Sequence, residues 1–207
     1  MQLDGVAARV GSMTILRDVN FGLEPGEAVG LFGANGAGKT TLLRVIATLM
    51  RPAAGTGTVL GVDITGPERS QVRPRVGLIG HTPGLYPELT LAENLQFAAQ
   101  IAGHSDESAA NALASVGLAG AGDRRVDACS HGMQRRAEFA REMMRAPTLL
   151  LLDEPHTALD PAAVELVGHL VERTIGSGGG VIVVSHDKER AAPLVQRTAE
   201  LTDGSLQ

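Results

Sequence analysis

The chain has 207 residues, a formal net charge of −5 and a hydrophobic share of 43%. This length fits one domain with a substantial core, and no stretch approaches the roughly eighteen consecutive apolar residues of a membrane helix. The acidic balance gives no general reason to bind nucleic acid or anionic lipid, and the first residues do not resemble a secretory signal. The single cysteine, Cys129, cannot close an internal disulfide, which suits a reducing compartment.

The first predicted elements in chain order are a strand and a helix. Residues 28–32 form a short apolar run that enters a glycine-rich turn. Apolar residues then recur at helical spacing over 40–50, and Arg51 and Pro52 are expected to end that helix. The unbroken leucines at 149–152 are typical of a strand buried on both faces, as in a parallel sheet covered by helices. Runs of this strand type span residues 75–79, 148–152 and 181–185.

Between residues 81 and 145 the pattern becomes helical, with no convincing strand. A helical insert in a chain that otherwise alternates strands and helices predicts an α/β fold with a separate helical part. We therefore expect one domain over 1–207, in which 1–80 and 146–207 form the core and 81–145 form a helical subdomain. Helices are expected at 91–102, 106–116, 132–145 and 161–175, the last with Asp160 as its N-cap.

A phosphate-binding pattern follows the first strand. Residues 33–40 match G-x-x-x-x-G-K-[ST] in the required context of strand, loop and helix. Glycines let successive backbone N–H groups face the phosphates, and the following helix points its positive end at them. Lys39 is one of only two lysines among 18 basic residues, and we expect it to reach the β- and γ-phosphates while the Thr40 hydroxyl holds Mg²⁺. The predicted ATP-binding residues of this loop are Gly33, Ala34, Asn35, Gly36, Ala37, Gly38, Lys39, Thr40 and Thr41.

Polar side chains end two of the other predicted strands. Asp153 and Glu154 follow the leucine run, at the strand end where α/β proteins build their sites. We predict that Asp153 binds Mg²⁺, directly or through water, and that Glu154 is the general base that polarises the attacking water. His186 follows another apolar run and is predicted to hydrogen-bond the γ-phosphate and that water. Each feature alone would also suit an ordinary strand-to-turn boundary.

The segment Cys129-Ser-His-Gly-Met-Gln-Arg-Arg136 resembles the signature of ABC ATPases, usually Leu-Ser-Gly-Gly-Gln, with a common Ser-x-Gly-Met-x-x-Arg variant. The Ser130 hydroxyl and the Gly132 N–H at a helix start would form a second anion-binding end. The resemblance implies a head-to-tail dimer in which Ser130, Gly132 and Met133 of one chain face the γ-phosphate of ATP held by another. Residues 156–160 resemble the D-loop, and so Asp160 is expected to join the site.

What the resemblance implies for the fold is a P-loop NTPase of the ABC ATPase type, with a RecA-like core, a mostly parallel sheet, a small antiparallel β region and a helical insert. Two positions depart from the family pattern. Val10 stands where most members carry an aromatic that stacks on adenine, and since base stacking is worth about 1–3 kcal/mol, base selectivity is expected to be weak. His81 stands where a Gln normally joins the Mg²⁺ shell, which leaves open a retuned metal sensor or a position whose Gln is dispensable.

The run Ile79-Gly-His-Thr-Pro-Gly84, followed by residues 89–95, resembles the haem-exporter ATPase group of cytochrome c maturation, the CcmA group, which commonly reads Gly-His-Gln-Pro-Gly. That resemblance implies an ATP-hydrolysing subunit that couples dimer closure to a membrane permease, with residues 83–95 as the docking face. It would act peripherally at the cytoplasmic face of the inner membrane, without inserting into it and without a nucleic-acid partner. The alternatives are an ATPase of an ABC-2-type drug or polysaccharide exporter, and a soluble or regulatory ABC ATPase.

Overall fold

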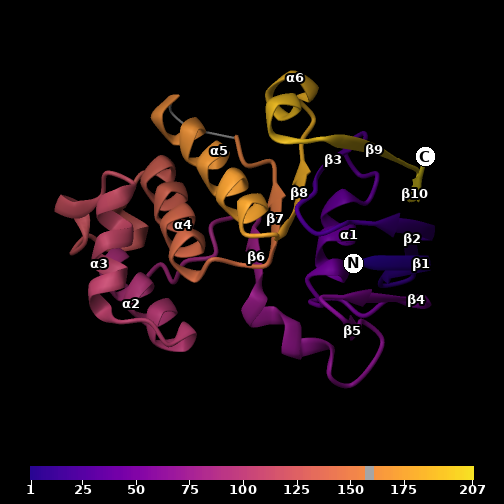
Figure 1. The fold of residues 1–207 in the computed structure, drawn as a ribbon, viewed down its shortest axis with the longest axis horizontal. Helices are drawn as coiled ribbons and strands as arrows, with labels where there is room; N and C mark the ends of the chain where they lie inside the picture. Colours follow the sequence, from indigo (N-terminus) through magenta and orange to yellow (C-terminus); the bar gives the residue numbers. More distant parts are fainter. Residues whose placement is uncertain (157–160) are drawn as a thin grey trace.

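The computed structural model describes residues 1–156 and 161–207, whose strands form two sheets (Figure 1). A four-stranded antiparallel sheet has the order β2-β1-β4-β5, and a six-stranded sheet has the order β10-β9-β3-β8-β7-β6. From β9 to β6 the neighbouring strands are parallel, and β10 pairs antiparallel with β9. The strands are β1 Gln2–Val10, β2 Met13–Gly22, β3 Ala28–Phe32, β4 Ala54–Val59, β5 Val62–Asp63, β6 Val76–Ile79, β7 Leu149–Asp153, β8 Gly180–Val184, β9 Arg197–Thr202 and β10 Ser205–Leu206.

Helices cover both faces of the larger sheet, α1 on one and α5 on the other (Figure 1). None in the described part of the chain is long and apolar enough to cross a membrane. The helices are α1 Lys39–Ile46, α2 Leu91–Ala102, α3 Asp106–Ser115, α4 His131–Arg145, α5 Pro161–Gly176 and α6 Lys188–Ala191, with short 3₁₀ turns at Arg69–Arg75, Ala119–Ala121, Val126–Ala128 and Ala192–Leu194.

The leucine run of β7 supplies both layers of the core. Leu149 and Leu151 pack with α1 and the antiparallel sheet, whereas Leu150 and Leu152 pack with α5. Successive side chains of a strand point to opposite faces, so a strand covered on both sides needs an apolar residue at every position. The predicted α/β fold, with its mostly parallel sheet and small antiparallel region, is confirmed.

The helix that follows the glycine-rich turn is shorter than its apolar pattern predicted. It ends at Ile46 rather than near Met50. Thr48 has a φ of 58°, and the N–H groups of Leu49 and Met50 both donate to the Arg44 carbonyl. This left-handed turn satisfies the last carbonyls of the helix and redirects the chain before it reaches the proline.

Three helices, α2, α3 and α4, pack around a hydrophobic cluster of their own, apart from the two clusters of the sheets (Figure 1). The start of α2 is fixed by a capping box, in which Thr90 and Glu93 each bond the other's backbone N–H. Ser130 caps α4, which begins at His131, one residue earlier than its pattern predicted. Unusually for a helix interior, α4 also buries charged side chains, namely Arg135, Glu138 and Glu142.

Candidate functional site

A cleft of about 580 Å³ lies where β3, β6, β7 and β8 end. Parallel strands carry their carboxyl ends to one edge of the sheet, which is where open α/β sheets bind ligands. The cleft brings together most of the predicted loop residues, the three polar residues predicted at the other strand ends, and His81. Its lining residues are Val10, Ile15, Asn35, Gly36, Gly38, Lys39, Thr40, Thr41, His81, Asp153, Glu154 and His186.

The loop between β3 and α1 has a shape that only glycine permits at two points. Gly33 has a φ of 145°, and a Cβ there would lie 2.2 Å from the Leu201 carbonyl oxygen. Gly38 has a φ of 108°, and a Cβ there would lie 2.9 Å from Cδ2 of Leu16. Gly38 is also the N-cap of α1, whose first turn has no acidic residue and no side-chain cap among the described residues. The N–H groups of that turn can therefore bind an anion.

Lys39 lies within this loop and is only 8% exposed. Its Nζ donates to the carbonyl oxygens of Gly33 and Ala34, at 2.7 and 3.0 Å. Gly33 and Ala34 line an adjoining hollow of about 350 Å³ together with Asn35. The Ala37 methyl, in contrast, packs into the core, so this residue can serve a ligand only through its backbone.

A hydroxyl and a carboxylate meet at the floor of the cleft. The Thr40 Oγ1 donates to Oδ2 of Asp153 at 2.6 Å, and Asp153 is 4% exposed. Hard oxygen donors of this kind fit Mg²⁺. No group of three or more His, Cys, Asp or Glu side chains in 1–156 or 161–207 could hold a metal ion. A Mg²⁺ ion at these two oxygens would have further coordination positions for phosphate oxygens and water.

Glu154 has an unusual backbone that explains how both carboxylates reach one cleft. Its φ is 53°, in the left-handed region, and its N–H donates to the Val184 carbonyl at 3.0 Å. Strand alternation would point Asp153 and Glu154 to opposite faces, but the left-handed turn places both beside the cleft. Such conformations cost about 1–3 kcal/mol in non-glycine residues and occur preferentially at functional sites.

The Glu154 carboxylate is also held by a histidine from the neighbouring strand end. Its Oε2 lies 2.8 Å from Nδ1 of His186, whose side chain is 70% exposed, whereas that of Glu154 is 17% exposed. A carboxylate that is partly buried and oriented by an imidazole is suited to accept a proton from water. His81, from the segment after β6, is exposed and lines the same cleft.

The predicted signature residues lie elsewhere on the chain. Ser130 is exposed, and its Oγ accepts a hydrogen bond from the Met133 N–H at 3.3 Å. A Cβ at Gly132 would meet open space. None of the three lines the cleft, and α4 lies on the far side of β7 and β8 from α1 (Figure 1). Asp160, the remaining predicted nucleotide contact, lies outside the described residues.

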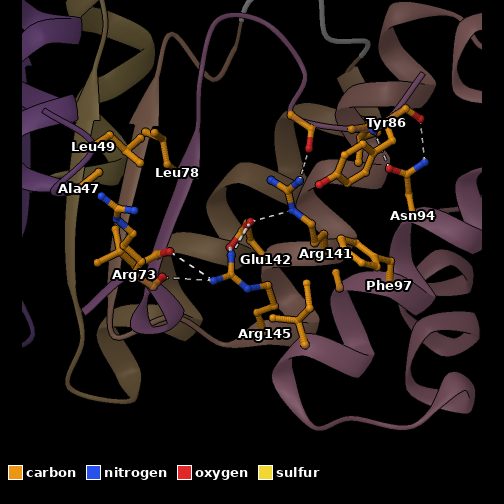
Figure 2. A pocket seen from close by; sticks show the side chains of 15 residues that line it. Ala47, Leu49, Arg73, Leu78, Tyr86, Asn94, Phe97, Arg141, Glu142 and Arg145 are labelled. Atoms are coloured by element: carbon orange, nitrogen blue, oxygen red, sulfur yellow. Dashed lines mark hydrogen bonds and ion pairs between the residues drawn. The ribbon is translucent and has the colours of Figure 1, made fainter. Parts of the chain in front are cut away.

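A second hollow, of about 470 Å³, lies between α2, α4 and the edge of the larger sheet (Figure 2). Leu49 and Leu78 stand on one side of it and Tyr86 and Phe97 on the other, with charged side chains of α4 between them. Tyr86 and Phe97 meet edge to face, with ring centroids 5.5 Å apart. Several large apolar residues here are exposed, a feature typical of interaction surfaces; these are Leu49, Tyr86, Phe97 and Ile101.

Comparison with known proteins gives concordant matches. The family described as ABC transporter matches residues 16–157. The chain is 36% identical over 185 residues to the cytochrome c biogenesis ATP-binding export protein CcmA 2 of Cupriavidus metallidurans, covering 88% of this chain and 87% of that one. It is 35% identical over 212 residues to the Nod factor export ATP-binding protein I of Paraburkholderia xenovorans, covering 99% of this chain and 68% of that one.

Among solved structures, the dimeric structure of a post-hydrolysis state of the ATP-binding cassette MJ0796, bound to ADP and Pi, matches with a TM-score of 0.89. The two chains are 26% identical, and the match covers 100% of this chain and 96% of the other. The fold predicted from the sequence is therefore that of a known ATP-binding cassette.

Proposed function

Because the chain belongs to the ABC transporter family of ATP-binding subunits and is an ATP hydrolase, we propose that it couples Mg-ATP-driven dimer closure to a permease that exports haem for cytochrome c maturation. The observation that carries the ATP-hydrolysing part of this proposal is the cleft, where Lys39, Thr40, Asp153, Glu154 and His186 converge.

We assign each residue a role in ATP hydrolysis from its position in the cleft. The backbone N–H groups of residues 33–41 and the Lys39 ammonium hold the phosphates. Bound at Thr40 and Asp153, Mg²⁺ would neutralise charge on the β- and γ-phosphates. Glu154 removes a proton from water as its oxygen attacks the γ-phosphorus, the bond to the β–γ bridging oxygen breaks, and ADP and phosphate leave. His186 orients the Glu154 carboxylate through the 2.8 Å contact.

The complete site is proposed to need two chains. Ser130, Gly132 and Met133 do not line the cleft of their own chain, yet Ser130 is exposed at the N-terminus of α4. A partner in head-to-tail orientation would bring that end to the γ-phosphate, where free N–H groups stabilise negative charge. The matched MJ0796 structure is described as dimeric. The partner is a second copy of this chain or a paired ATPase subunit.

The hollow between α2, α4 and the sheet edge is the proposed permease contact. Its exposed rim of Leu49, Tyr86, Phe97 and Ile101 would bury apolar area against a short segment of the permease. The segment that follows β6 connects this surface to the nucleotide cleft, since Tyr86 lines one and His81 the other. The subunit would then lie peripherally at the cytoplasmic face of the inner membrane.

The proposed cargo rests on similarity to a CcmA protein, supported by the Gly-His-x-Pro-Gly pattern at residues 80–84. A second candidate is an ABC-2-type drug or polysaccharide exporter, which the similarity to a Nod factor export protein favours. Isolation of the native protein from membranes, with identification of the permease that accompanies it, decides between them. Recovery with cytochrome assembly factors supports haem export, whereas recovery with a drug or polysaccharide permease contradicts it.

ATP turnover by the purified chain tests the enzymatic part directly. Phosphate release should require Mg²⁺ and should rise more steeply than in proportion to protein concentration, because the site is completed by a second chain. Release that is strictly proportional to concentration, from a protein that remains monomeric with ATP, would contradict the two-chain site and favour a soluble or regulatory ATPase.

A further inference from the structure

The segment 80–86 connects the nucleotide cleft to the permease surface. His81 lines the cleft and Tyr86 lines the hollow. Within the part of the chain that the structure describes, residues 81–85 form no backbone-to-backbone hydrogen bond. Among the described residues, the hydrogen bonds that hold this segment therefore come from side chains.

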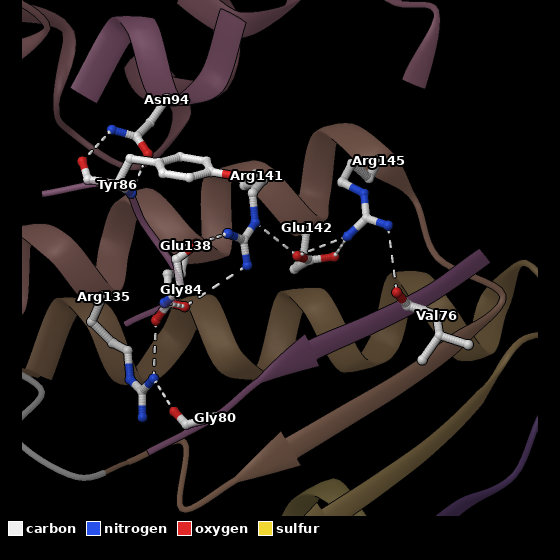
Figure 3. Close-up of polar contacts among 10 residues, drawn as sticks. All are labelled: Val76, Gly80, Gly84, Tyr86, Asn94, Arg135, Glu138, Arg141, Glu142 and Arg145. Atoms are coloured by element: carbon white, nitrogen blue, oxygen red, sulfur yellow. Dashed lines mark hydrogen bonds and ion pairs between the residues drawn. The ribbon is translucent and has the colours of Figure 1, made fainter. Parts of the chain in front are cut away.

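Side chains of α4 hold residues 80–84, and Asn94 of α2 holds Tyr86 (Figure 3). The Arg135 guanidinium donates to the carbonyl of Gly80, the residue directly before His81. Glu138 Oε1 accepts a hydrogen bond from the Gly84 N–H at 2.7 Å, and Arg141 donates to the Gly84 carbonyl. Residues 80–84 are thus fastened to α4 on both sides of His81, while the Tyr86 backbone is bonded to Asn94 of α2, at 2.8 and 3.1 Å.

Arg135 and Glu138 are joined to each other as well. Arg135 Nη1 lies 3.0 Å from Glu138 Oε2, and the exposed fractions of the two side chains are 0% and 1%. Nε and Nη2 of Arg135 have no hydrogen-bond partner among the described residues. A buried ion pair is often no more stabilising than apolar residues of the same volume, so stability alone is a weak reason for this one. Its bonds to Gly80 and Gly84 indicate a positional reason.

We propose that the buried Arg135–Glu138 pair is a positioning device that sets His81 against the nucleotide cleft and ties it to the signature end of α4. Ser130, at that end, is the proposed contact to the partner's nucleotide, and Arg135 lies in the same helix. A shift of α4 on dimer closure is then transmitted to His81 and Tyr86 through the bonds at Gly80 and Gly84. This role rests on the proposed function.

Tyr86 provides a readout that needs no catalysis. It is the only tyrosine in the chain, and the chain has no tryptophan, so intrinsic fluorescence reports on this segment alone. Glu138→Ala removes both the Gly84 acceptor and the partner of Arg135, whereas Glu138→Gln keeps the acceptor and removes the charge. We expect acrylamide to quench Tyr86 more strongly in Glu138→Ala than in Glu138→Gln, and in both more strongly than in the unmodified protein.

Turnover gives the second readout. Displacement of His81 should lower kcat by about 10- to 100-fold, because positioning errors near 1 Å have effects of this size, while ATP affinity is retained by the phosphate loop. A double-mutant cycle with His81→Ala separates positioning from general destabilisation. If the pair acts through His81, Glu138→Gln lowers kcat in the unmodified background and has no further effect beside His81→Ala. Equal effects in both backgrounds would overturn the proposal.

Two further variants serve as a control and as a substitute. Glu27→Gln breaks a different and more exposed ion pair, with Arg197 near the opposite edge of the sheet, and should leave both Tyr86 quenching and kcat unchanged. If Glu138 variants fail to fold, Arg135→Lys keeps the charge beside Glu138 but loses the forked donor that reaches Gly80, so it should loosen the segment in a folded protein. Unaltered Tyr86 quenching in all folded variants overturns the positioning role, whether or not the unmodified chain hydrolyses ATP. If the unmodified chain hydrolyses no ATP, that result alone counts against the proposed function.

Discussion

Replacing Glu154 separates the chemistry of the site from the strain of its backbone. Glu154→Gln keeps the shape of the side chain and its place 2.8 Å from His186 but removes the proton acceptor. General bases contribute about 10²- to 10⁴-fold to rate, so kcat should fall by that range. ATP binding should persist, because Lys39 and the phosphate loop are untouched.

The backbone of Glu154 predicts an inverted order of stability between two smaller side chains. At its φ of 53°, any residue with a Cβ is strained by about 1–2 kcal/mol, which glycine avoids. The glycine variant loses about 0.4–1 kcal/mol of this gain, because an unfolded chain with glycine at this position has more conformational entropy to lose on folding. Glu154→Gly should therefore be more stable than Glu154→Ala by up to about 1.6 kcal/mol, whereas at an ordinary strand position alanine is the more stable.

Phosphate release in the presence of Mg²⁺ measures the first effect, and urea unfolding followed by circular dichroism measures the second. The Ala and Gly variants both lack the carboxylate and its contact with His186, so their difference reports the backbone alone. Full hydrolysis by Glu154→Gln would refute the assignment of the base. An alanine variant more stable than the glycine variant would refute the strained turn that brings both carboxylates to the cleft.

Three other predictions follow from the cleft, its flank and the permease surface. Val10→Tyr should restore base stacking and tighten ATP binding by about 1–3 kcal/mol, with a preference for ATP over UTP measured by competition; equal affinities before and after would contradict an open base site. Burial, aided by the Arg190 charge, holds the pKa of His156 below its usual value. The stability that neutral His156 contributes is therefore present when the pH is above that usual pKa, and it is lost as the pH falls through it. Urea titrations from neutral to mildly acidic pH should show less of this loss in His156→Gln. Ile101→Asp should weaken copurification with the permease, because it places a charge in the apolar rim, whereas undiminished copurification would move the contact elsewhere.

The sequence located the glycine-rich loop after β3 and the ends of the central strands well, because their chemistry leaves few choices. A strand buried on both faces must be apolar throughout, as at Leu149–Asp153 up to its last residue, and a loop that wraps phosphate needs glycine where φ is positive. The family and the fold are confirmed. The catalytic and binding roles of individual residues, including Ser130 and His81, stay predictions.

The antiparallel sheet was not located in the sequence, for reasons that lie in its strands. Ala54–Val59 contains two glycines and looks like a turn, yet a Cβ at Gly57 would lie 2.6 Å from the Gln2 carbonyl oxygen. Those glycines allow β4 to approach β1 closely, which is a tertiary requirement. The early end of α1 was also missed, because the helix ends in a turn in which Thr48 has a positive φ, a conformation that threonine rarely adopts.

The permease surface and the charges of α4 could not be derived from periodicity. Phe97 and Ile101 fit the apolar pattern of a helix, but the pattern does not tell which apolar residues stay uncovered. Glu138 and Glu142 would ordinarily be assigned to a solvated face, but here they are buried and paired with arginines of the same helix. Such pairing depends on what the rest of the fold packs against α4.

The central claim, that each ATP is held between two chains, is tested most directly by mixing two inactive variants. Lys39→Ala disables the phosphate loop of its own chain, and Ser130→Arg disables the signature end that the partner would use. In a symmetric head-to-tail dimer, a mixed pair contains one site built from two unmodified halves, so an equal mixture should recover about a quarter of the original ATP hydrolysis. A mixture that forms mixed dimers yet stays as inactive as either variant alone would show that Lys39 and Ser130 do not act on the same ATP across two chains.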